Sequence, residues 1–168
     1  DIVSCIIIPA KSGGGFKFTS EIDADLGQKI KMTDAERMIF TNYHEAWHCI
    51  DGDMRGETDQ SDRKEAYIKT YISENISDVG AVVDMIKEGY EAQKILDAIQ
   101  QSRAFRVLSN PIDANAETNM THYTLPALHA LETYIEQKGV ASIKNMTAAQ
   151  TVDFVVNLVS ENILDAET

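Results

Sequence analysis

Residues 67–86, which read YIKTYISENISDVGAVVDMI, decide the fold. One apolar stripe recurs at helical spacing and consists of Ile68, Ile72, Ile76, Val79, Val83 and Ile86. A second line of residues on the other side, set by a turn of about 100° per residue, consists of Tyr67, Tyr71, Glu74, Asp78, Ala81 and Met85. A helix that is largely apolar on both sides is predicted to be buried. Its two carboxylates then need partners or a metal ion, because burying an uncompensated charge is costly.

This buried helix is expected to begin near Asp62 and to run to Gly89. Asp62 followed by Glu65 matches the pattern of a capping box, in which two side chains satisfy the free backbone N–H groups of a first turn. Gly89 offers a residue that tolerates the left-handed conformation at a helix end.

An earlier helix is predicted from Asp34 to Ile50. Thr33 and Glu36 form another capping box, and the range holds neither Gly nor Pro. Gly52 is expected to end this helix and to open an acidic loop over residues 51–62. A calcium site in that loop is disfavoured, because the acids lack the alternation and the terminal Glu of an EF-hand. A solvated loop is the favoured interpretation.

The earlier helix carries the segment HEAWH at residues 44–48. Positions i and i+4 of a helix share a face, so His44 and His48 can bind one metal ion. Glu45 lies one position round from His44 and can reach a water on that ion without being a ligand. The opposing interpretation is a surface helix with two unrelated histidines. It is disfavoured by the bulky apolar neighbours, which are Phe40, Tyr43, Trp47 and Ile50.

Candidates for a third ligand lie downstream of HEAWH. They include Glu74 and Asp78, which are one turn apart on the buried helix, and also Asp51, Asp53, Glu65 and His122. The opposing interpretation of Glu74 and Asp78 is an ordinary pair of solvated acids, which requires both side chains to be exposed.

The segment HEAWH followed by ENISD at residues 74–78 resembles the gluzincin clan of zinc metallopeptidases, which includes the thermolysin-like enzymes. The resemblance covers roughly residues 33–89, about a third of the chain. It implies a Zn²⁺ cofactor bound by three ligands, which are His44, His48 and Glu74. It also implies Glu45 as the general base, and Asp78 as the carboxylate that holds a motif histidine in the correct tautomer.

The resemblance leaves one role unassigned, the donor that stabilises the oxyanion. His122 and Tyr123 are catalytic candidates by chemistry, because both side chains donate hydrogen bonds. They follow the irregular segment 112–121, and loops of this kind often carry site residues. Tyr71, one turn before Glu74, is a rival for the same role.

The remaining sequence predicts a single, mainly α domain (α+β) over residues 1–168, a compact zincin-like helical domain with a small N-terminal β-hairpin. The hairpin would pair the β-branched run at residues 2–8 with residues 16–19 across a triple glycine. Further helices are expected after Gly89, between Thr124 and Gly139, and after the capping box of Thr147 and Gln150.

Composition limits the classes of partner. The chain has 168 residues with 15 basic and 27 acidic side chains, a net charge of −12. This charge argues against nucleic acid and against anionic membrane surfaces. No stretch approaches the roughly 20 apolar residues of a membrane span. Two cysteines are too few for a disulfide framework.

These observations predict a zinc metallopeptidase that hydrolyses peptide bonds in a protein or peptide substrate. An alternative from another class is a non-catalytic helical interaction module with a structural or vestigial metal site. A third reading is a helical bundle with no metal, which requires Glu74 and Asp78 to be exposed. Glu45 separates the first two hypotheses. A peptidase needs it as a general base, whereas a structural site has no need of one.

Overall fold

A computed structural model of the chain describes residues 32–55, 63–109 and 121–163. Every element in these ranges is a helix: α2 (Asp34–Arg55), α3 (Arg63–Glu88), α4 (Ala92–Ser109), α6 (Leu125–Lys138), α7 (Val140–Lys144) and α8 (Ala148–Asn162). The expectation of a mainly helical domain is therefore confirmed. The expected N-terminal β-hairpin lies outside the described residues, as do Asp62 and most of the acidic loop.

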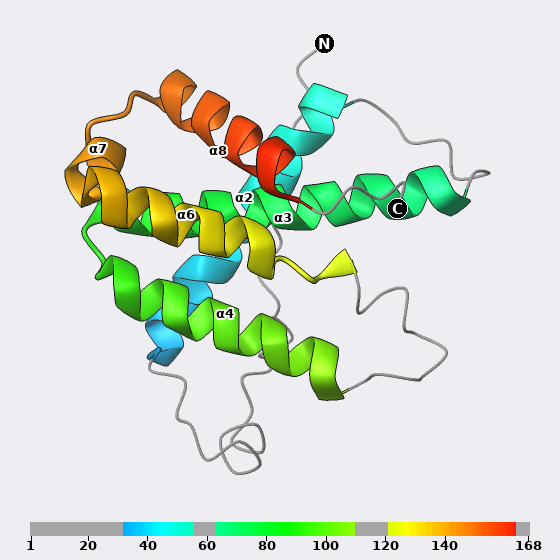
Figure 1. The fold of residues 1–168 in the computed structure, drawn as a ribbon, viewed down its shortest axis with the longest axis horizontal. Helices are drawn as coiled ribbons and strands as arrows, with labels where there is room; N and C mark the ends of the chain where they lie inside the picture. Colours follow the sequence, from blue (N-terminus) through cyan, green and yellow to red (C-terminus); the bar gives the residue numbers. More distant parts are fainter. Residues whose placement is uncertain (1–31, 56–62, 110–120, 164–168) are drawn as a thin grey trace.

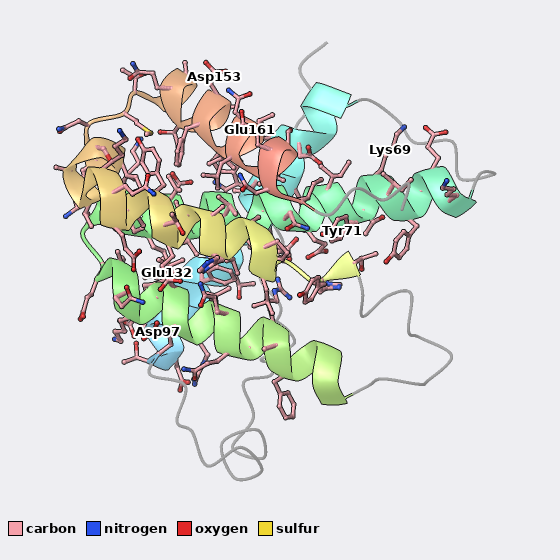
Figure 2. All side chains as sticks on the ribbon, viewed as in Figure 1. Lys69, Tyr71, Asp97, Glu132, Asp153 and Glu161 are labelled. Carbon is pink, nitrogen blue, oxygen red and sulfur yellow. The ribbon has the colours of Figure 1, made fainter. Side chains whose placement is uncertain are left out.

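Helix α3 lies at the centre and packs against each of the other five helices. In Figure 1, α2 crosses behind α3, while α6 and α8 pass in front of it. Helix α4 packs on both α3 and α6. Glu132 of α6 fixes part of that contact, because its carboxylate accepts hydrogen bonds from Gln93 and Gln100 of α4 (Figure 2). The prediction that the helix over 67–86 is buried is confirmed, since every residue from Glu74 to Val83 is buried.

The contact between α2 and α3 depends on the absence of a side chain at Gly80. A Cβ atom built there would lie 2.2 Å from Cδ2 of the Trp47 ring, far inside van der Waals contact. The Trp47 indole therefore lies directly on the backbone of α3, and its Nε1–H donates to Asp84 Oδ2 at 2.8 Å. This close packing brings His44 and His48 of α2 against the two acids of α3, Glu74 and Asp78.

The sequence signals for helix ends are confirmed at most positions. Thr33 and Glu36 exchange both hydrogen bonds of a capping box, at 2.7 and 3.2 Å. Thr147 and Gln150 do the same at 2.9 and 3.3 Å. Within the described ranges, the two glycines with positive φ are the ones expected to end helices, Gly89 at 102° and Gly139 at 77°. Helix α7, which follows Gly139 directly, has no counterpart among the expected elements.

One expected boundary is wrong. Helix α2 passes through Gly52 and ends at Arg55, so Asp51 lies on a helix and is buried instead of starting a solvated loop. A glycine inside a helix costs only about 1 kcal/mol relative to alanine, which packing against a neighbouring helix easily exceeds. Among the described residues, no helix is long and apolar enough to cross a membrane.

Candidate metal centre

The two motif histidines of α2 point at Glu74 of α3. His44 is buried and His48 half-buried, and their Nε2 atoms are 3.0 Å apart. Glu74 Oε2 lies 3.5 Å from His44 Nε2, and Glu74 Oε1 lies 3.6 Å from His48 Nε2. These three residues form a group whose ligand atoms all lie within 4.8 Å of one another. The preferred third ligand, Glu74, is thus the one that the fold brings to the histidines.

The spacing of these atoms fits a tetrahedral zinc ion. Zinc bonds to nitrogen and oxygen of about 2.0–2.2 Å place tetrahedral ligands roughly 3.3–3.5 Å apart. The two Nε2 atoms are 3.0 Å apart and His44 Nε2 lies 3.5 Å from Glu74 Oε2, both close to that range, while His48 Nε2 lies 3.6 Å from the other carboxylate oxygen, Oε1. Two imidazoles and one carboxylate also form the donor set of zinc hydrolases that leave one position open.

Asp78 fixes the orientation of His44. Its Oδ1 lies 2.9 Å from His44 Nδ1, and its side chain is fully buried. Burial raises the pKa of Asp78, but the Arg103 guanidinium and the His44 contact outweigh burial and hold this pKa well below its ordinary value. An ionised carboxylate only accepts hydrogen bonds, so the proton of neutral His44 belongs on Nδ1. Its Nε2 lone pair then faces His48 and Glu74.

His48 is oriented in a similar way from the other side. Its Nδ1 lies 2.9 Å from Ser73 Oγ, so both ring nitrogens have a defined neighbour. Burial lowers the pKa of His48, and the nearby His44 lowers it further, although Glu45, Asp78 and Asp51 act in the opposite direction. A lowered pKa keeps the ring neutral near pH 7, which is the state that binds a metal.

Two residues that contact Asp78 were not anticipated from the sequence as parts of the site. Arg103 of α4 donates to Asp78 through Nε at 2.6 Å and through Nη2 at 2.5 Å, and Thr124 donates to Asp78 Oδ2 at 2.6 Å. Arg103 is 1% exposed. A signal for it exists, because Ile95, Ile99 and Arg103 follow one another at four-residue spacing. An arginine that continues an apolar line predicts a buried partner of opposite charge.

His122 lies beside the group formed by His44, His48 and Glu74. Its Nε2 lies 3.3 Å from Glu74 Oε2, and its Nδ1 lies 3.1 Å from Thr121 Oγ1. Tyr123 is half-buried and makes no hydrogen bond to the group in the described part of the chain. Glu45 is exposed, and its charge acts to raise the pKa of His48.

The other ligand candidates are placed differently. Asp78 faces Nδ1 of His44, the nitrogen that points away from the group. Glu65 is exposed and forms an ion pair with Lys69 at 2.9 Å. Asp51 is buried on the histidine face of α2, and the Asp53 side chain lies outside the described residues. Glu74 and Asp78 are 8% and 0% exposed, so the interpretation of these two as solvated acids is wrong.

Comparisons with known proteins add no relative to this picture. A scan against protein-family models found no match, and searches of curated proteins and of solved structures found no similar chain.

Proposed function

We propose that the protein is a zinc-dependent metallopeptidase. The observation that carries the proposal is the arrangement of His44, His48 and Glu74, whose ligand atoms all lie within 4.8 Å of one another and whose two imidazoles and one carboxylate match the donor set of zinc hydrolases. The contact of Asp78 with His44 Nδ1 supports it, because carboxylate–histidine pairs of this kind orient the ligands of many zinc sites.

Apart from the metal ligands, the reaction would rest on two groups of this chain, a general base and a hydrogen-bond donor. When bound, zinc lowers the pKa of a water molecule and polarises a carbonyl group. Glu45 would take a proton from that water as it attacks the peptide carbonyl, and would pass the proton to the leaving amine. His122, 3.3 Å from Glu74, would donate a hydrogen bond to the developing oxyanion. Tyr123 is the alternative donor, and a protein or peptide is the proposed substrate.

The first test is metal content. The purified protein and the variants His44→Ala and His129→Ala are loaded with Zn²⁺, desalted and assayed by elemental analysis. His129 is the matched control, because it is an exposed histidine on α6. We expect about one zinc per chain in the parent and in His129→Ala, and little in His44→Ala. Equal zinc in all three proteins would contradict the proposed ligands.

The second test separates hydrolysis from metal binding. Glu45→Gln keeps the size of the side chain and removes the base, so we expect zinc to stay bound while hydrolysis of a peptide mixture falls by about 10²–10⁴-fold. Glu161→Gln, at an exposed position of α8 (Figure 2), should leave both properties unchanged. Full activity in Glu45→Gln would remove Glu45 from the mechanism.

The same experiments decide between the peptidase and the structural alternative. A structural site would bind zinc and lose melting temperature when the metal is stripped, and no peptide in a broad mixture would be cleaved. That result would overturn the peptidase proposal and would leave an interaction module with a metal site.

A further inference from the structure

Two threonines occupy the same position in their helices but use their hydroxyl groups differently. Thr147 precedes α8, and its Oγ1 accepts a hydrogen bond from the backbone N–H of Gln150. Thr124 precedes α6 and makes no such bond within its helix. Its hydroxyl donates instead to Asp78 Oδ2, 2.6 Å away on α3. Threonine at this position usually caps its own helix, so the hydroxyl of Thr124 is directed to the metal centre.

Arg103 meets the same carboxylate from α4. Its Nε and Nη2 atoms bind one oxygen each, at 2.6 and 2.5 Å. A planar guanidinium that binds both oxygens fixes the plane of the carboxylate as well as its charge. Nη2 also lies 3.8 Å from Glu74 Oε2, so the Arg103 guanidinium forms ion pairs with both Asp78 and Glu74.

These contacts leave the Asp78 carboxylate one orientation. Oδ2 receives Arg103 Nε and the Thr124 hydroxyl, while Oδ1 receives Arg103 Nη2 and faces His44 Nδ1 at 2.9 Å. Rotation of the carboxylate would break bonds to α4 and to the start of α6 together. The tautomer and the direction of the His44 ring are therefore set, through Asp78, by Arg103 of α4 and by Thr124 at the start of α6.

We infer that Arg103 and Thr124 are positioning residues of the metal centre, which hold Asp78 so that His44 presents Nε2 to the ion. The inference rests on the proposed zinc site but not on the proposed peptidase activity. The carboxylate that they hold is of a kind known to matter, since loss of a hydrogen-bond partner of a metal ligand commonly weakens metal binding by about 10–100-fold.

The test compares the two threonines in the full chain. Thr124→Val removes the hydroxyl at constant shape, Thr124→Ser restores it, and Thr147→Val removes the capping hydroxyl of α8. Zinc affinity is measured by competition with a chelator, and the ligand geometry is read from the visible absorption spectrum of the Co²⁺-loaded protein.

We expect Thr124→Val to bind zinc at least tenfold more weakly and to change the cobalt spectrum, and Thr124→Ser to restore both. Thr147→Val should lose roughly 2–4 °C of melting temperature with unchanged affinity and spectrum. A loss of melting temperature alone would not move the spectrum, so this readout separates positioning from stability.

Arg103→Lys supplies an independent variant, because lysine keeps the charge but cannot bind both oxygens in one plane. We expect a similar loss of zinc affinity in a folded protein. Parental affinity and spectrum in Thr124→Val, or an equal loss in Thr147→Val, would overturn the inference while leaving the zinc site intact. A parent chain that binds no zinc would overturn the proposed function as well, so the two failures are distinguishable.

Discussion

Asp78 and Asp84 both connect α3 to the HEAWH segment of α2, but they differ in what compensates their burial. Asp78 faces His44, and Asp84 accepts a hydrogen bond from the Trp47 indole at 2.8 Å. Burial raises the pKa of both carboxyls. At Asp78 the Arg103 guanidinium and the contact with His44 reverse the effect, and this pKa is lowered. At Asp84 the hydrogen bond from Trp47 and the charge of Lys87 only reduce the rise that burial causes, and the pKa of this carboxyl stays raised.

The difference shows that a hydrogen bond and a counter-charge satisfy different needs of a buried carboxylate. A neutral indole N–H supplies the geometry but leaves much of the cost of removing the charge from water. A guanidinium cancels the charge and fixes two oxygens at once. Asp78 is therefore held as an anion that can only accept, which is the state that orients His44, whereas Asp84 has a structural task that a neutral carboxyl could also perform.

The largest effect is expected from Asp78→Asn. This variant removes the negative charge that compensates Arg103 and leaves the buried guanidinium against a neutral amide. Breaking a buried ion pair by removing one partner costs about 3–5 kcal/mol. We expect a loss of this size in the free energy of unfolding, measured by urea denaturation, together with loss of zinc binding. A loss below 1 kcal/mol would show that Asp78 and Asp84 are equivalent after all.

A smaller effect is expected from Gly80→Ala, which disturbs the position of Trp47, the hydrogen-bond partner of Asp84. The new methyl group would displace Trp47 from α3, at a cost of about 1–3 kcal/mol. Trp47 is the one tryptophan of the chain, so its fluorescence reports the displacement directly.

Gly52→Ala is the matched control for this variant, since nothing lies within 4 Å of the added Cβ and the position is helical. We expect it to gain up to about 1 kcal/mol with unchanged Trp47 fluorescence. A Gly80→Ala protein that behaves like this control would contradict the close contact between Trp47 and α3.

The smallest effect is expected from Asp84→Asn, which keeps an acceptor for Trp47 and should alter stability by about 1 kcal/mol or less at pH 7. Its informative property is pH dependence. Because the pKa of Asp84 is raised in the folded state, protonation favours the folded parent as the pH falls through that pKa towards the ordinary 3.8. The stability of the parent relative to Asp84→Asn should therefore rise on acidification, in parallel urea titrations. A constant difference would contradict the raised pKa.

Local signals in the sequence predicted much of the helical framework. The capping boxes at Thr33 and Thr147, and the glycines at 89 and 139, act through bonds and torsions within a few residues, so they can be recognised without a structure. The doubly apolar helix over 67–86 also predicted its own burial, and with it the burial of Glu74 and Asp78.

What the sequence could not provide depends on contacts between distant segments. Gly52 carries the same local signal as Gly89, but α2 continues through it to Arg55, and Asp51 beside it is buried. Thr124 looks ordinary in its own segment, and the apolar line that ends in Arg103 predicts a buried acidic partner without saying which one. Both roles depend on where α4 and the start of α6 meet Asp78. The HEAWH and ENISD segments indicated a metal group, whereas the residues that hold Asp78 in place required the fold.

The contacts of Asp78 also bear on when the centre can form during synthesis of the chain. They join residues separated by 25 positions at Arg103 and 46 at Thr124, and 34 (78 − 44) at His44. A nascent chain that ends between Asp78 and Arg103 lacks this guanidinium, so the Asp78 carboxylate gains its counter-charge only after the segment of α4 that carries Arg103 has been synthesised.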